Sequence, residues 1–227
     1  ISACLVGSEM CIRDRFRNLR SQIEEGRYRA KAVAELCKPL ISGFAAGGDD
    51  QADEADGVPH LRPMNITPGG EVTLAQTKHV PLSAMSSAEE IKSGEILFNN
   101  TNSSRWVGKS AVFASAELCA CSNHITRLRL RDVADSPTFF AALLNAMRSI
   151  GYFAALATNF NNQAGINTDT LGKLRLPVPP PSVQSDIAAE VDRRRDEARR
   201  QRQAARAGWV EARRAFEEAL LGPASFQ

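Results

Sequence analysis

The spacing of hydrophobic and polar positions divides the chain into three segments. In residues 16–37, apolar side chains recur close to every 3.6 positions, which predicts a helix that stops before Pro39 and Gly43. From Pro59 onward, short apolar runs alternate with polar residues and with turns rich in proline and glycine, which predicts strands. In residues 182–221 a narrow apolar stripe continues without any proline, which predicts one long helix.

The middle segment predicts an α+β fold with a mixed or antiparallel sheet. Its six strand candidates are residues 60–66, 71–74, 95–99, 109–114, 125–130 and 172–177. In the fifth, apolar residues alternate with arginines, so we expect one buried face and one basic face. Ser136 and Pro137 predict the start of a helix that Gly151 closes, and a polar loop is expected at 158–167.

The last segment is dense in alanine, arginine, glutamate and glutamine, which all favour helix. We expect its apolar stripe to pack on another helix through Ile187, Val191, Ala198, Ala205, Phe216 and Leu220. A helix of this length spans roughly 60 Å at 1.5 Å per residue, which is too long to be buried in a small domain. We therefore expect a coiled-coil partner along it; a single helix stabilised by its own charges is the alternative.

Composition narrows the class of protein. The chain has 227 residues, 43% of them hydrophobic, and a net charge of +2, as an ordinary globular protein would have. No apolar stretch is long enough to cross a membrane. Five cysteines without a secretory signal predict reduced thiols and a cytoplasmic location. The spacing of Cys119 and Cys121 does not suit zinc, so we expect them to pack in a strand.

The N-terminal segment of the chain resembles a sequencing artefact. Residues 5–15 resemble the conceptual translation of a transposon adapter used in sequencing libraries. We therefore expect residues 1–15 to be an artefact and the natural N-terminus to be missing. The expected organisation is a helical lead-in at 16–37, a main α+β domain at 38–181, a long helix at 182–221 and a tail at 222–227.

Signatures of catalysis are absent or incomplete. The segment 107–110 ends like a phosphate-binding loop but lacks the leading glycine. Glu90 and Lys92 have the spacing found in many nucleases, but only the acidic loop at 49–56 offers the upstream aspartate that such a site needs. There is no glycine-rich dinucleotide turn and no amino-methyltransferase motif. We therefore expect no catalytic residue, no metal site and no cofactor in this chain.

Amide side chains concentrate in three clusters, at residues 99–104, 122–124 and 159–167. Asparagine and glutamine can pair with the adenine edge in the major groove, while arginine and lysine suit phosphates; the alternative is that asparagine and serine only form turns. The expected base readers are Asn99, Asn100, Asn102, Asn123, Asn162 and Gln163. The expected phosphate contacts are Arg62, Lys78, Lys109, Arg127 and Arg129. Further candidates for contact with double-stranded DNA are Asn65, His124 and Asn167.

Six motifs carry a family resemblance. They lie, in order, at residues 58–66, 91–103, 107–109, 122–127, 162–167 and 176–184. Together they resemble the target recognition domain of type I restriction–modification specificity subunits, over about residues 36–221. The resemblance implies a non-catalytic reader of a split DNA site, whose long helix packs antiparallel against another.

The same resemblance implies partners. These are adenine methyltransferase subunits, a restriction and translocase subunit, and a second copy of the long helix; S-adenosylmethionine, Mg²⁺ and ATP would enter only through partner subunits. The full subunit has two recognition domains and this chain has one. It is therefore the second half of such a subunit, a half-length subunit that pairs with itself, or the tail of a fused N6-adenine DNA methyltransferase or restriction enzyme.

Overall fold

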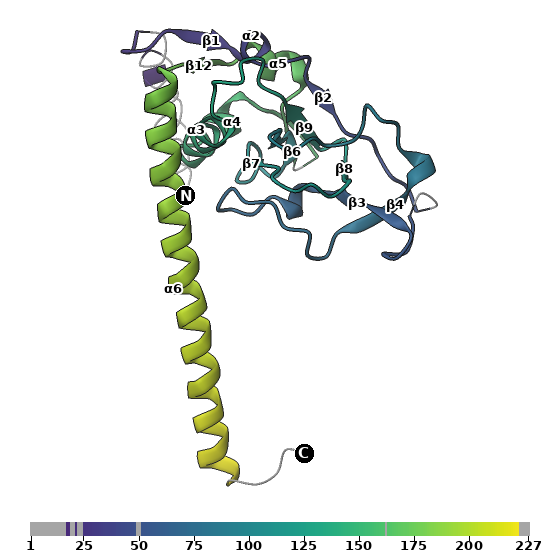
Figure 1. Cartoon of the computed structure of the whole chain (residues 1–227), viewed down its shortest axis with the longest axis vertical. Helices are drawn as coiled ribbons and strands as arrows, with labels where there is room; N and C mark the ends of the chain where they lie inside the picture. Colours follow the sequence, from purple (N-terminus) through teal and green to yellow (C-terminus); the bar gives the residue numbers. More distant parts are fainter. Residues whose placement is uncertain (1–16, 19–20, 22–24, 49–50, 162, 223–227) are drawn as a thin grey trace. The chain divides into compact units, whose positions relative to one another are not determined.

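The computed structural model describes residues 17–18, 21, 25–48, 51–161 and 163–222, except for the side chain of residue 221. The chain divides into two compact units, with the boundary between Ser185 and Asp186. The first unit holds all the sheets and the shorter helices, and the second is the greater part of the long helix α6 (Pro181–Leu221) (Figure 1).

A four-stranded antiparallel sheet forms the centre of the first unit. Its strands lie in the order β2 (Ile41–Ser42), β9 (Ile125–Leu128), β5 (Ile96–Asn99) and β7 (Ser110–Val112). Every residue of β5 is buried, because both faces of this sheet are covered. Ile96 and Phe98 pack in one hydrophobic cluster, and Leu97 between them packs in the other.

Helices cover the face of the central sheet that carries Ile96 and Phe98. They are α3 (Pro137–Ser149), α4 (Tyr152–Leu156) and α5 (Thr168–Lys173). The side chain of Ser136 accepts the N–H of Phe139 and caps α3, as the Ser-Pro pair predicts. The buried face of α3 includes Phe140, Leu144 and Met147, so the expected apolar stripe points into the core.

A second sheet covers the other face, in the order β4 (Lys78–Pro81), β3 (Gly57–Leu61) and β8 (Ala120–Cys121). Strand β3 is antiparallel to β4 and parallel to β8, so this sheet is mixed. The 3-10 turns η1 (Pro63–Asn65) and η2 (Leu82–Ala84) follow β3 and β4. Figure 1 shows α3 and α4 on one side of the central strands and β3, β4 and β8 on the other.

The polar segment expected to be a loop at 158–167 is instead a β-hairpin. Strands β10 (Thr158–Phe160) and β11 (Gln163–Gly165) pair with each other, and β11 also pairs with β6 (Thr101–Asn102). Asn161 at the turn has a φ of 44°, in the left-handed region that asparagine tolerates well. The expectation failed because short polar strands carry no apolar alternation.

The predicted helix over 16–37 is wrong for its last part. Strand β1 (Ala30–Ala32) pairs with β12 (Arg175–Pro177), and only α2 (Val33–Leu36) is helical after it. Ala30, Val33 and Leu36 do face the core, but the strand partner lies about 145 residues away in sequence, where no local pattern reveals it. This short two-stranded sheet completes the set of sheets in the described residues.

Three strand predictions also need correction. The strand predicted at 60–66 is β3, which ends at Leu61 because Pro63 begins the 3-10 turn η1. Residues 71–74 form no strand, because Val72 makes only an isolated bridge with Ile66. The predicted strand at 172–177 begins late, since α5 continues to Lys173. The strands predicted at 95–99, 109–114 and 125–130 are confirmed as β5, β7 and β9, and the α+β class is confirmed with them.

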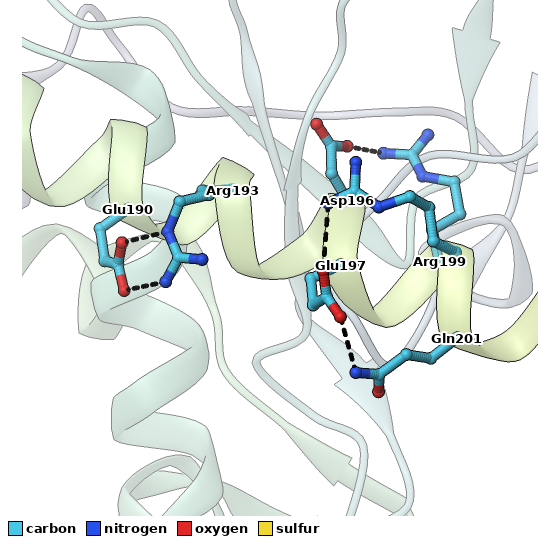
Figure 2. Close-up of polar contacts among 7 residues, drawn as sticks. Glu190, Arg193, Asp196, Glu197, Arg199 and Gln201 are labelled. Atoms are coloured by element: carbon cyan, nitrogen blue, oxygen red, sulfur yellow. Dashed lines mark hydrogen bonds and ion pairs between the residues drawn. The ribbon is translucent and has the colours of Figure 1, made fainter.

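The long helix is confirmed as α6, with 41 residues. Many of its charges pair within the helix at spacings of three and four residues. Figure 2 shows Arg193 on Glu190, Arg199 on Asp196 and Gln201 on Glu197. Hydrogen bonds from Arg193 and Arg194 lower the pKa of Glu190 to about 2. Among the described residues, no helix is long and apolar enough to cross a membrane.

Candidate nucleic-acid interface

The three amide clusters, which lie far apart in the sequence, meet around the buried residue Asn100. Its Nδ2 donates to the backbone O of Asn123 at 3.0 Å and to Oγ1 of Thr126 at 2.9 Å. Its backbone N–H donates to the carbonyl of His124 at 3.0 Å, and its own carbonyl accepts the N–H of Ile166 at 2.9 Å. One residue therefore ties the clusters together and holds their exposed side chains in one region.

One face of the sheet β10-β11-β6 lies outward. Ala164 is buried, so its neighbours Gln163 and Gly165 face away from the core. The ring of Phe160 covers Gly165, where a Cβ would lie 2.8 Å from the ring, yet this phenylalanine is 49% exposed. The exposed and half-buried side chains around Asn100 form what we call the amide edge: Thr101, Asn102, Asn123, His124, Phe160 and Gln163.

The structure buries three asparagines that the sequence assigns to DNA. Asn65 is fully buried, and its amide donates to Oγ1 of Thr77 while its Oδ1 accepts the N–H of Arg62. Asn99 is also fully buried and donates to the carbonyl of Trp106 at 3.1 Å. Together with Asn100, these side chains have interior partners and hold loops in place.

Two expected phosphate contacts are buried as well. Nζ of Lys109 donates to the carbonyls of Pro63 at 2.7 Å and Ile66 at 2.6 Å. Burial, and then the charge of Arg148, lowers the pKa of Lys109. The guanidinium of Arg127 donates to the carbonyls at 88 and 90, because both faces of β9 are covered and Arg127, its one arginine, does not face solvent.

The remaining candidates differ in their surroundings. Arg129 is half-exposed and pairs with Glu95 at 3.4 Å. Arg62 and Lys78 form no ion pair with the described residues; Arg62 is half-buried and Lys78 is exposed on β4. Asn167 is exposed, but its side chain caps α5 by accepting the N–H of Thr170 at 2.8 Å. Asn162 lies outside the described residues.

A basic and aromatic cluster that the sequence analysis missed lies next to the amide edge. The ring of Trp106 has three cations around it, with Arg105 Cζ at 4.8 Å, Arg148 Cζ at 5.6 Å and Lys109 Nζ at 5.6 Å from its centroid. Arg105 and Trp106 are adjacent in a loop of serine and asparagine, and this pair was a local signal of a basic and aromatic cluster. Nothing in the sequence placed Arg148, from α3, beside them.

Burial shifts the pKa of several titratable side chains in the interior. Burial lowers the pKa of His60, whose Nε2 donates to the carbonyl of Phe44 at 3.2 Å. Burial raises the pKa of each buried thiol to about 12, and these thiols are Cys37, Cys119 and Cys121. In the part of the chain that the structure describes, no group of three histidine, cysteine, aspartate or glutamate residues could hold a metal ion.

The outer half of α6 exposes apolar side chains. Phe216 is 64% and Leu220 is 67% exposed, and both belong to the stripe expected to pack on another helix. Trp209 is 71% exposed and Val210 is 60% exposed nearby. The pairing of this stripe with another helix stays a prediction.

No protein-family model matches this chain. A protein named as the specificity subunit of the type I restriction enzyme MjaX, from Methanocaldococcus jannaschii, is 30% identical over 96 residues, which are 42% of this chain and 23% of that protein.

Three of the solved structures that resemble this chain illustrate the likeness. One, reported for complex assembly and conformational transition of the type I restriction–modification system, has a TM-score of 0.60 at 18% identity and covers 96% of this chain and 57% of its own. The HsdS subunit from Thermoanaerobacter tengcongensis has a TM-score of 0.56 at 16% identity, with coverage of 89% and 49%. The type IIG restriction endonuclease BpuSI has a TM-score of 0.53 at 10% identity, with coverage of 72% and 26%.

These likenesses bear on the fold. The chain spans about half the length of the solved type I chains it matches and about a quarter of the curated relative. The similarity includes both the sheets with their helices and most of the chain after them, since it covers 96% of the sequence in the first structure. The chain has the fold of type I restriction–modification specificity subunits.

Proposed function

We propose that this chain reads DNA sequence as part of a type I restriction–modification specificity subunit and performs no catalytic step itself. The observation that carries the proposal is the convergence of three polar clusters on Asn100, which leaves amide, hydroxyl and aromatic side chains exposed together. Amides suit adenine edges, and an exposed aromatic ring suits the thymine methyl group. The likeness of the chain to the specificity subunits supports the same function.

The proposed base contacts are the members of the amide edge. Asn100 supports that edge from beneath through its hydrogen bonds with Asn123 and Thr101. The buried residues Asn65, Asn99 and Asn100 are not proposed to touch DNA. Arg62 and Lys78 remain candidates for phosphates, because neither has an acidic partner among the described residues. Asn167 is assigned to its capping role.

The proposed organisation keeps a recognition domain at 38–181 and an arm at 182–221. We propose that the arm pairs with a second long helix and that the protein works in the cytoplasm with double-stranded DNA and adenine methyltransferase subunits. A restriction and translocase subunit would complete the assembly. S-adenosylmethionine, Mg²⁺ and ATP would bind those partners, so the purified chain is expected to transfer no methyl group.

Selection from a random duplex library tests the proposal. The whole chain is incubated with random duplexes, bound DNA is recovered over several rounds, and the product is sequenced. Enrichment of a short motif of a few base pairs is expected, and a library that stays random would overturn the proposal.

A matched pair of variants links the result to the amide edge. The variant Asn123→Ala/His124→Ala/Gln163→Ala removes three exposed polar side chains and should enrich no motif while keeping its melting temperature. Gln51→Ala removes an exposed amide elsewhere and should enrich the same motif as the wild type. Equal motifs from both variants would exclude the amide edge as the reader.

A second candidate function is the recognition part of a fused restriction enzyme. The likeness to BpuSI, a type IIG restriction endonuclease, favours it, because 26% of that chain matches 72% of this one. Sequencing the gene upstream of residue 16 decides between the two. A second recognition domain would support the specificity subunit, and a methyltransferase motif would support the fused enzyme.

A further inference from the structure

We propose that Arg105, Trp106 and Arg148 form a binding site for one phosphate of the DNA backbone, next to the amide edge. This inference rests on the proposed function and extends it to residues that lie outside the amide edge. A site of this kind fixes where the protein sits along the duplex, whereas the amide edge would read the bases.

The first observation is an accumulation of positive charge without an acidic partner. Arg105, Lys109 and Arg148 all lie within 5.6 Å of the Trp106 ring centroid. Among the described residues, no carboxylate forms an ion pair with any of the three. Like charges held this close repel each other, and a bound phosphate would offset that repulsion.

The second observation is that the two arginines have free donors. Lys109 is already held by two backbone carbonyls, so its ammonium is a fixed charge near the ring. Neither Arg105 nor Arg148 donates a hydrogen bond to a described residue, and Nε of Arg148 is buried without any partner there. Guanidinium groups with open donors suit the oxygens of a phosphate.

The third observation is the position of the cluster. The carbonyl of Trp106 accepts a hydrogen bond from the side chain of Asn99 at 3.1 Å, and the carbonyl of Asn99 accepts the N–H of Gly108 at 2.8 Å. This loop follows β6 directly, and β6 carries Thr101 and Asn102 of the amide edge. A phosphate on the cluster would therefore lie beside the edge that faces the bases.

An alternative explanation is purely structural. Arg148 is in the last turn of α3, where the helix dipole favours a cation, and arginine packs well on tryptophan. That explanation accounts for Arg148 but not for a second unpaired arginine, Arg105, on the same ring. The structural explanation predicts that substitutions of the two arginines lower the stability of the fold. The phosphate site predicts that they weaken the binding of anions and DNA.

The proposal is tested first with small anions. Trp106 and Trp209 are the two tryptophans of the chain, so Trp209→Phe leaves Trp106 as the only indole emitter. In that background, iodide should quench Trp106 more strongly than in Arg105→Gln or Arg148→Gln, because the cations attract the anion. Neutral acrylamide should quench all three equally, and inorganic phosphate should protect Trp106 from iodide. Equal iodide quenching in all three proteins would overturn the site.

The second test uses duplex DNA at several salt concentrations. Arg105→Gln and Arg148→Gln should each weaken binding to the enriched and to a scrambled duplex about tenfold, since a hydrogen bond to a charged group is lost. Each should also lower the salt slope by about one. Arg148→Lys keeps the charge and should retain the slope. Arg131→Gln, an exposed arginine away from Trp106, is the matched control and should change neither quantity.

The outcomes separate the two proposals. If the wild type binds both duplexes equally while the variants still lower the slope, the phosphate site stands and sequence recognition fails. If the wild type discriminates while the variants keep its slope and affinity, recognition stands and the phosphate site fails. A fall in melting temperature with unchanged binding assigns the arginines to structure and also overturns the site.

Discussion

Replacing the buried Asn100 by alanine should lower stability, although the same residue type a few positions away is expected to read DNA. The substitution removes the donors to Asn123 O and Thr126 Oγ1, and it removes the Oδ1 that accepts the hydroxyl of Thr101 at 2.8 Å. Asn100 is 6% exposed, so little water is available to replace these partners.

The size of the effect follows from these contacts. Each lost hydrogen bond costs about 1 kcal/mol, and a carbonyl left without a partner adds to this. Thr126 keeps its contact with Ser42 at 3.0 Å, so it is not left unpaired. The free energy of unfolding should therefore fall by about 2–4 kcal/mol, which corresponds to a fall in melting temperature of roughly 5–15 °C for a protein of this size.

Urea denaturation and thermal melting of Asn100→Ala measure this loss directly. Asn123→Ala is the matched control, because its side chain is exposed and the change should cost no more than about 0.5 kcal/mol. If Asn100→Ala were as stable as the control, Asn100 would not hold the clusters together. If Asn123→Ala were the less stable of the two, the assignment of buried support and exposed reader would be reversed.

Three further predictions concern other parts of the chain. The free energy of unfolding should fall as the pH drops below 6.5, because His60 binds a proton in the unfolded chain at a higher pH than in the folded chain, where burial lowers its pKa. Urea melts of His60→Gln at several pH values should lack this fall. Iodoacetamide at pH 8, followed by peptide mass spectrometry, should leave three buried thiols unlabelled in the folded protein and label them in urea: Cys37, Cys119 and Cys121; rapid labelling without urea would refute their burial. The arm should lose self-association or methyltransferase-subunit binding, as judged by sedimentation, when three stripe residues are changed to aspartate: Val191, Ala205 and Phe216; an unchanged mass and unchanged subunit binding would refute the arm's role.

Local signals predicted the elements that local contacts build. The helix α3 could be predicted because its cap, its apolar stripe and its closing Gly151 are all near in sequence. Strand β9 could be predicted as a strand, but the direction of Arg127 could not. Its face of the sheet is covered by residues near position 90, and no pattern within β9 indicates that cover.

The candidate site shows the same limit. The three amide clusters could be located along the chain, but their burial depends on contacts across the fold. Asn99 and Asn102 look alike in sequence, yet Asn99 ends the buried strand β5 and Asn102 lies in the half-buried strand β6. Arg148 approaches Trp106 only because α3 ends beside the loop after β6. Such proximity between distant segments is what a single sequence does not reveal.

The central claim is that exposed side chains of the amide edge, and not its buried asparagines, distinguish one DNA sequence from another. The most direct measurement is the ratio of dissociation constants for a scrambled and an enriched duplex, for the wild type and for Gln163→Ala. Loss of one bidentate amide should cost about 1–3 kcal/mol of binding free energy on the enriched duplex alone. The ratio should therefore fall roughly 5- to 150-fold. A ratio that stays the same in Gln163→Ala, and also in the triple variant of the edge, would contradict the account.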